Sequence, residues 1–223
     1  MRFGYVFGFV IVYLFAYLFA ALLLAAKPAR AAGNANPDSY QRGDHDTAAN
    51  EFKLRAERGE RLAQFNLAMM IFRDEAAGDR ALAIAWLRKS AEQALPQAQY
   101  NLGLLYENGA GVPRSQTDAT AWFRRAAEQG HTDAQVSLAT QYMLGRGAPK
   151  DLAQAAIWYE RAAEGDDVAA QYIIASFYEQ GDGVKQDLPR ARAWYTEAAR
   201  QGDKLAKAKA DEVTKRIAEG GKR

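Results

Sequence analysis

The chain has 223 residues, 29 of them basic and 27 acidic, and it contains no cysteine, which excludes disulfides and thiol chemistry. Arg2, Lys27 and Arg30 lie in an N-terminal segment without acidic residues, and in the rest of the chain the acidic residues outnumber the basic ones. The formal charge of +2 therefore gives no support for a nucleic-acid-binding surface.

The chain begins with a long uncharged segment, residues 3–26. At about 1.5 Å per residue in a helix, this segment is long enough to span a hydrocarbon core of about 30 Å. A cleaved export signal would start at Arg2 and end at the small-x-small site Ala29-Arg30-Ala31. An uncleaved signal anchor would better explain the length, since signal cores usually run about 7–15 residues. Both interpretations predict that the chain is exported to the periplasm, either soluble after cleavage near Ala31 or anchored in the inner membrane.

The rest of the chain is built from repeats. Four tryptophans are each 36 residues apart, at Trp86, Trp122, Trp158 and Trp194. Residues suited to cap a helix N-terminus recur at nearly the same spacing, at Asp44, Asp79, Ser115, Asp151 and Asp187. Self-similarity at a fixed period indicates a solenoid, in which each unit buries its apolar face against its neighbours. After the N-terminal segment 1–31 we expect a linker, five repeats and a short tail, with the boundaries 32–43, 44–78, 79–114, 115–150, 151–186, 187–219 and 220–223.

Each repeat is predicted to contain two helices. The first carries an apolar stripe at 3–4 spacing, which in the third repeat consists of Ala119, Trp122, Phe123, Ala126 and Ala127. We expect its aromatic residues to dominate the core. The second helix has a small residue in its middle, at Ala68, Gly103, Ala139 and Ala175, and a large one three positions later, at Ile71, Tyr106, Tyr142 and Tyr178. A glycine in mid-helix costs about 1 kcal/mol relative to alanine, so we predict that another helix crosses closely at Gly103.

Glycines mark the predicted turns. Gly59, Gly130 and Gly202 follow the first helices, where a left-handed residue suits the helix end. Ala94 and Asp166 stand at the equivalent positions, so these two turns should be strained. After the second helices a glycine pair recurs, at Gly109 and Gly111, Gly145 and Gly147, and Gly181 and Gly183. A G-x-G motif indicates phosphate binding when it follows a strand. Here it follows a helix and repeats, so we predict a tight turn between repeats.

These motifs resemble the Sel-1-like repeats, relatives of the tetratricopeptide repeat. The pattern W-[FY]-x-x-A-A, then A-Q-Y-x-L-G-x-x-Y, then G-x-G-V is followed closely over 86–113, 122–149 and 158–184, and the likeness extends from residue 44 to about residue 215. The resemblance implies an all-α, right-handed α-solenoid of stacked antiparallel helix pairs with a concave groove. It also implies adaptor work, in which the groove binds a segment of another protein. The matched positions are structural, so the resemblance transfers no functional residue.

The sequence contains almost no catalytic constellation. The two histidines, His45 and His131, lie in different repeats and at different repeat positions. We interpret them as exposed turn residues, because a metal site or an acid–base pair would need them close together. No serine-nucleophile motif is present. We therefore predict no catalytic residue, no metal site, no cofactor and no small-molecule substrate.

One surface feature is a candidate partner-binding site. Basic residues recur two and three positions after the tryptophans, and Lys53 is equivalent in the first repeat; the set is Lys53, Arg88, Lys89, Arg124, Arg125 and Arg161. Stacking of the repeats would align Lys53, Arg88 and Arg124 in a basic row that becomes acidic toward the C-terminus. Such a row can steer an acidic partner segment, or an anionic lipid or cell-wall group. The simpler interpretation is a solvated face.

Three functions follow from these observations. The leading hypothesis is a non-catalytic interaction scaffold in the bacterial cell envelope. The second is a hydrolase acting on β-lactams or peptidoglycan, by analogy with cysteine-rich relatives, although this chain has neither cysteine nor a serine-nucleophile motif. The third is a membrane-anchored component of a secretion, motility or signalling assembly, which differs from the first mainly in whether the N-terminal segment stays attached.

Overall fold

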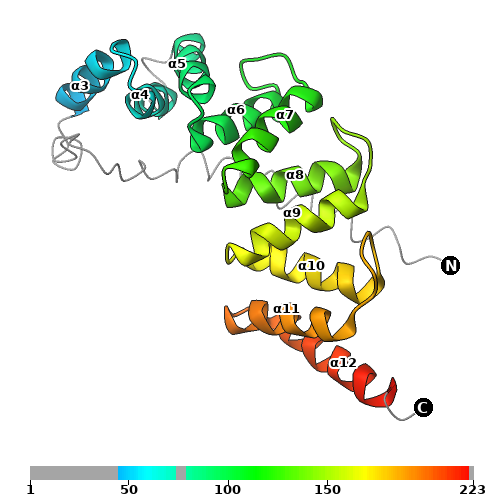
Figure 1. Ribbon diagram of the computed structural model, residues 1–223. Coiled ribbons are helices and arrows are strands. Elements are labelled where there is room, and N and C mark those ends of the chain that lie inside the picture. The colour runs from blue at the N-terminus through cyan, green and yellow to red at the C-terminus, as the bar shows by residue number, and fades with distance from the viewer. Residues whose placement is uncertain (1–44, 74–78, 221–223) are drawn as a thin grey trace. The chain divides into compact units, whose positions relative to one another are not determined.

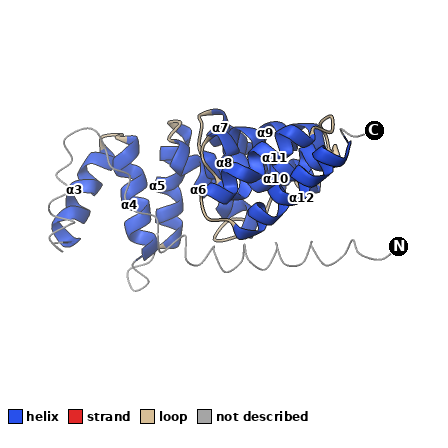
Figure 2. Cartoon of the chain, turned by 90° about the horizontal axis from the view of Figure 1, so that it is seen from below, coloured by secondary structure: helices blue, strands red, loops and turns tan. Residues whose placement is uncertain are grey.

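The computed structural model describes residues 45–73 and 79–220 of the chain. Over these residues the chain consists of α-helices and turns, without a strand (Figures 1 and 2). The helices are α3 (His45–Glu57), α4 (Arg61–Arg73), α5 (Arg80–Glu92), α6 (Pro96–Asn108), α7 (Gln116–Glu128), α8 (Thr132–Leu144), α9 (Leu152–Glu164), α10 (Val168–Gln180), α11 (Leu188–Arg200) and α12 (Lys204–Gly220). The predicted all-α class is confirmed.

The predicted N-terminal signal or anchor segment, residues 1–31, lies outside the described residues, as do the linker 32–43 and the cap Asp44. Among the helices that the structure does describe, none combines the length and the apolar character needed to cross a bilayer. The export of the chain therefore stays a prediction from the sequence.

The chain forms two compact units, Met1–Ala83 and Ile84–Arg223. In the first unit α3 and α4 pack against each other, and the side-chain amide of Gln64 on α4 donates to the carbonyl oxygen of Ala56 on α3 at 3.1 Å. In the second unit, helices α6 to α12 form one stack in which each helix packs on the next (Figure 1). This is the arrangement expected of a solenoid, because each helix pair buries its apolar face against its neighbours.

One ring from each first helix forms the centre of the second unit's core. Phe123 of α7, Tyr159 of α9 and Tyr195 of α11 are at most 1% exposed, and alanines of the same helices surround them. The tryptophans that precede these rings differ in burial: Trp122 and Trp194 are half-buried, whereas Trp158 is buried, with 7% of its surface exposed. The expectation that both aromatics belong to the core is therefore confirmed for Trp158, whereas Trp122 and Trp194 lie at the edge of the core.

Capping residues define the starts of the first helices. The side-chain oxygens of Asp79, Ser115, Asp151 and Asp187 each accept a hydrogen bond from a backbone N–H three residues later, at 2.9–3.1 Å. These four predicted caps are confirmed. Asp167 and Asp203 cap the second helices α10 and α12 in the same way. Each cap satisfies a backbone donor that has no partner inside its helix.

The repeated glycine pairs form tight turns, as predicted. Gly109, Gly145 and Gly181 end α6, α8 and α10 in the left-handed conformation. The second glycine of a pair lies against the start of a first helix, because a Cβ on Gly147 would lie 2.0 Å from the carbonyl oxygen of Gln116. A Cβ on Gly183 would approach that of Leu152 to 2.3 Å. The close backbone contact, rather than a ligand, explains why glycine recurs here.

Two further predictions about small residues and turns are confirmed. A Cβ on Gly103 of α6 would lie 2.6 Å from Cε1 of Phe123 on α7, so the two helices cross closely there. Ala94 and Asp166 have φ angles of 59° and 65°. The left-handed conformation costs a residue with a side chain about 1–2 kcal/mol, which packing of the adjoining helices must offset.

A buried glutamine joins the two helices in each of the first four repeats. Its side-chain amide donates to the carbonyl oxygen eight residues earlier, at 3.1–3.3 Å, for Gln64, Gln99, Gln135 and Gln171. A second glutamine links adjacent repeats, since Gln129 donates to Gln99 at 2.7 Å and Gln201 donates to Gln171 at 3.1 Å. Gly165 occupies the equivalent position after α9, so this second link is missing between α8 and α9.

We predict that Gly147→Ala destabilises the fold much more than Gly130→Ala. Both glycines have positive φ, which costs alanine about 1–2 kcal/mol. A Cβ at Gly147 also overlaps the carbonyl of Gln116, whereas nothing lies within 4 Å at Gly130. Overpacking adds roughly 1–3 kcal/mol or more. Urea unfolding of the two variants, followed by circular dichroism, tests the difference. Equal losses of stability would contradict the close contact.

Candidate functional site

The predicted partner-binding residues of the second unit lie on its first helices, and the cation of each one contacts an aromatic ring. Lys89, Arg125 and Arg161 each place their cation over the tryptophan three residues earlier, at 4.3, 4.5 and 4.5 Å from the ring centroid. Residues three apart share one face of a helix, and a cation over an indole face is attracted by the ring quadrupole. Each of these tryptophans thus fixes the cation that follows it.

Arg88 and Arg124 contact a different ring, on the second helix of the same repeat. Nη2 of Arg88 donates to the hydroxyl oxygen of Tyr106 at 3.0 Å, and Nη2 of Arg124 donates to that of Tyr142 at 2.9 Å. The guanidinium carbons lie 6.0 and 5.9 Å from the two ring centroids, and both arginines are exposed. The recurring tyrosine therefore has a role on the surface as well as in packing.

The next repeat reverses the polarity of this contact. Glu160 stands at the position of Arg88 and Arg124, and the Tyr178 hydroxyl donates to it at 2.9 Å. Arg190 of α11 donates to the same carboxylate oxygen at 2.7 Å, and its guanidinium lies 4.3 Å from the Tyr178 ring centroid. Burial, and then the hydrogen bond to Glu160, raise the pKa of Tyr178 to about 12.

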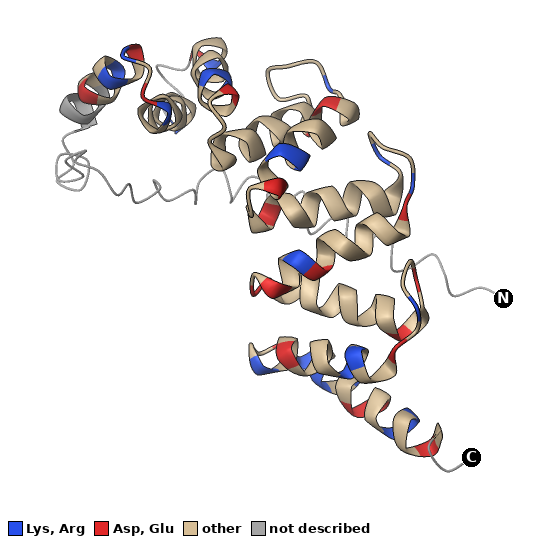
Figure 3. Cartoon of the chain, viewed as in Figure 1, with Lys and Arg blue, Asp and Glu red and all other residues tan. Residues whose placement is uncertain are grey.

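The structure tests only part of the predicted basic row, because its members lie in two separate compact units. Lys53 lies exposed on α3 in the first compact unit, so its alignment with Arg88 and Arg124 stays a prediction. Positive and negative residues are interspersed along α7 to α12 (Figure 3). At the C-terminal end of the row Glu197 pairs with Arg200 at 3.0 Å.

His131 is not the exposed turn residue that the sequence suggests. It caps α8, where its Nδ1 accepts a hydrogen bond from the backbone N–H of Ala134 at 3.4 Å, and its ring stacks on Tyr100 at 4.8 Å. Burial lowers its pKa, although the charge of Asp133 acts in the opposite direction. The stacking partner lies on α6, which no local pattern around His131 identifies. The side chain of His45 lies outside the described residues.

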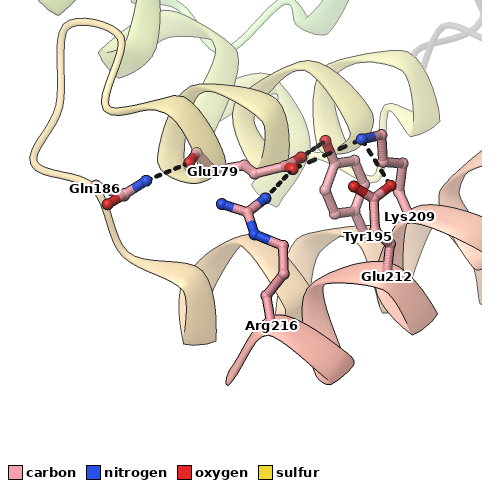
Figure 4. A network of polar contacts seen from close by, with 6 residues as sticks. All are labelled: Glu179, Gln186, Tyr195, Lys209, Glu212 and Arg216. Atoms are coloured by element: carbon pink, nitrogen blue, oxygen red, sulfur yellow. Dashed lines mark hydrogen bonds and ion pairs between the residues drawn. The ribbon is translucent and has the colours of Figure 1, made fainter. Parts of the chain in front are cut away.

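A buried carboxylate that the sequence does not single out joins the last three helices. The Glu179 side chain is 2% exposed and accepts hydrogen bonds from Tyr195 at 2.9 Å and Arg216 at 2.5 Å (Figure 4). Lys209 lies 3.6 Å from the same carboxylate. Burial, and then the bond to Glu179, raise the pKa of Tyr195. The network ties α12 to α10 and α11, so it acts as a structural clamp on the last helix.

A second carboxylate stands at the equivalent position two repeats earlier. Glu107 of α6 is half-buried and accepts a hydrogen bond from the amide of Gln141 on α8 at 2.7 Å. Burial raises the pKa of Glu107. Within the described ranges, no three histidine or acidic side chains come together in a way that would hold a metal ion.

The comparisons with known proteins agree with this repeat geometry. The Sel1 repeat model matches residues 61–95, 96–131, 132–167 and 168–203. The chain belongs to the Sel1 repeat family. Each matched repeat begins at a second helix and ends after the following first helix. The match at 96–131 consists of α6 and α7, the pair that meets closely at Gly103 and Phe123. No curated protein matches the chain.

Two solved structures of Sel1 repeat proteins are similar to the chain. A Sel1 repeat protein from Oxalobacter formigenes is 32% identical, with a TM-score of 0.73, and the match covers 78% of this chain and 72% of that protein. A protective antigen present in uropathogenic Escherichia coli strains, which displays the same repeat fold, is 38% identical, with a TM-score of 0.67. That match covers 71% of this chain but only 34% of the antigen.

We predict that Glu179→Ala weakens the docking of α12 by roughly 1–3 kcal/mol, because it leaves the buried Tyr195 hydroxyl without its acceptor and removes the bonds to Arg216 and Lys209, whose side chains are 39% and 33% exposed. Glu212→Ala is the matched control, because Glu212 is 55% exposed and pairs with the same Lys209 at 3.0 Å. An exposed ion pair contributes little to stability, because water screens both charges. Hydrogen exchange of the α12 amides measures both losses. Equal protection in the two variants would show that Glu179 does not clamp the helix.

The lowered pKa of His131 predicts a pH dependence of stability. Between the folded-state pKa and the ordinary value of 6.5, the unfolded state binds more protons than the folded state. Stability is therefore complete above pH 6.5 and falls as the pH drops below that value. His131→Asn keeps a capping side chain that does not titrate. The difference in unfolding free energy between wild type and variant, measured from about pH 8 to about pH 5, should shrink with falling pH. A constant difference would contradict the shift.

Proposed function

We propose that this chain is a non-catalytic scaffold of the bacterial cell envelope that binds a segment of another protein in the concave groove of its solenoid. Sel1 repeat proteins are generally protein-interaction scaffolds, and membership of that family supports the first part of the proposal. The uncharged residues 3–26, which follow Arg2, support export. The two solved relatives described above come from bacteria.

The recurring cation–ring contacts are the observation that carries the interaction surface. Five basic residues of three consecutive first helices project from the fold, and each rests on an aromatic ring: Arg88, Lys89, Arg124, Arg125 and Arg161. Ordering a long side chain costs binding energy. The rings already restrain these cations in the free protein. Binding of a partner would therefore cost less side-chain entropy here than on a surface of unrestrained lysines.

The fate of the N-terminal segment separates two forms of the proposal. Cleavage after Ala31 would release a soluble scaffold, whereas retention of residues 3–26 would make the chain a membrane-anchored component of a secretion, motility or signalling assembly. The repeats would face the periplasm in both forms.

Cross-linking and affinity capture of the tagged full chain from the envelope fraction test the proposal. We expect Arg88→Glu together with Arg124→Glu to reduce the captured partner at least tenfold without changing the circular dichroism spectrum. The matched control reverses two exposed lysines of α12, Lys204→Glu with Lys207→Glu, and should retain the partner. The N-terminus read from the same sample distinguishes cleavage from anchoring. Partner capture that is the same for all three proteins would refute the proposed surface.

A further inference from the structure

The second unit displays two matching arginine–tyrosine pairs, Arg88 with Tyr106 and Arg124 with Tyr142. We infer that each pair is a receptor for one carboxylate, so that the scaffold's partner is a protein segment with two acidic side chains that bind one repeat apart. This inference rests on the proposed scaffold function and specifies the chemistry of the partner.

The hydrogen-bonding capacity of each pair fits a carboxylate. A guanidinium has five N–H donors and no acceptor, and only one of the N–H groups of Arg88 is used by Tyr106. Since the tyrosine oxygen accepts that bond, its own hydrogen remains available to a further acceptor. The same holds for Arg124 and Tyr142. Each pair therefore offers donors from two side chains, together with a positive charge, on the exposed surface.

The fold does not neutralise these two arginines. The ion pairs between described residues involve other basic side chains, and neither Arg88 nor Arg124 is paired with a carboxylate of the described part of the chain. Both are exposed, unlike Arg216, which reaches the buried Glu179. Charge complementarity therefore favours an incoming anion at each pair.

The next repeat shows how such a carboxylate is bound. Glu160 receives one hydrogen bond from the Tyr178 hydroxyl at 2.9 Å and one from an arginine, Arg190, at 2.7 Å. The donors are the same two kinds of group that the Arg88 and Arg124 pairs present. Glu160 stands in the place of the arginine itself, and Arg190 comes from the following repeat, so this site shows that a tyrosine hydroxyl and a guanidinium together bind one carboxylate on this surface.

The surrounding charges favour discrete carboxylates over a continuous polyanion. Exposed acidic residues lie on the same helices, Glu92 on α5 and Asp118 and Glu128 on α7. They would repel a nucleic acid, which carries a negative charge about every 1.7 Å along a duplex. A peptide can place its two acids at the pairs and uncharged residues beside these carboxylates.

Selection from a random peptide library, with the purified full chain in mild detergent as bait, tests the inference. We expect the selected peptides to share two Asp or Glu positions. The best peptide is then resynthesised with Gln or Asn at those positions, and its binding is measured by fluorescence anisotropy. The acidic form should bind at least tenfold more tightly. Selected peptides without acidic positions, or equal binding of the neutral form, would overturn the inference.

Variants of the chain identify the receptor. Tyr106→Phe with Tyr142→Phe removes two hydroxyls and keeps the rings, and should weaken the acidic peptide roughly fivefold for each hydroxyl. Arg88→Gln with Arg124→Gln should weaken it further. Tyr178→Phe is the matched control, because its hydroxyl is already bound to Glu160, and should leave binding unchanged. An effect of Tyr178→Phe equal to that of the double variant would refute the assignment.

A competition arm separates a peptide carboxylate from other anions. Heparin and inorganic polyphosphate should displace the acidic peptide only weakly; if either binds more tightly than the peptide does, the receptor is for polyanions and the inference fails. A different result distinguishes failure of this inference from failure of the proposed function. A partner captured from the envelope that is lost with Arg88→Glu and Arg124→Glu but is bound unchanged by Tyr106→Phe with Tyr142→Phe would leave the proposed function intact and overturn this inference alone.

Discussion

The close approach of each second helix to the first helix of the next repeat is the contact on which the second unit depends. At Gly103 and Phe123 the two helices lie so near that a single methyl group would not fit without movement. The ring of that next helix, Phe123, Tyr159 or Tyr195, is thereby enclosed almost completely. Since the ring of one repeat is buried by the repeat before it, no repeat completes its own core, and the end of the stack needs a different solution. The Glu179 clamp on α12 provides one.

The sequence predicts the features of this fold that are local and periodic. A 36-residue spacing, capping residues and paired glycines each act within a few residues of the chain. The amino-acid pattern alone therefore places the helix starts at Asp79, Ser115, Asp151 and Asp187 and the turns at Gly145 and Gly181. The same is true of the strained turns at Ala94 and Asp166, whose positions follow from comparison with the glycines of the other repeats.

Contacts between distant residues cannot be predicted in this way, because they depend on how helices lie side by side. Tyr106 lies 18 residues from Arg88, and Arg216 lies 37 residues from Glu179. The sequence predicts the basic residues as a row of charges, but it does not predict the aromatic ring that each of those described in the second unit contacts. For the same reason the predicted exposure of His131 is wrong, since its stacking partner Tyr100 is on another helix. The predicted burial holds for Trp158 but not for Trp122 and Trp194, because the sequence pattern does not distinguish the edge of a core from its centre.

The surface shows how one scaffold can change its binding chemistry by a single position in each repeat. Tyrosine is kept at Tyr106, Tyr142 and Tyr178, while its partner on the first helix is arginine twice and glutamate once. A hydroxyl can accept from the first and donate to the second, so the tyrosine tolerates either charge without altering the packing beneath it. Specificity can therefore change while the core stays the same.

The missing glutamine link at Gly165 shows that adjacent repeats can be joined by different groups. The joints of α6 with α7 and of α10 with α11 are each bridged by a pair of side-chain amides. At the joint of α8 with α9, the hydroxyls of Thr140 and Tyr159 form a hydrogen bond at 2.8 Å instead. The stack can therefore accept glycine in place of one linking glutamine, because another pair of side chains on the same two helices is hydrogen-bonded.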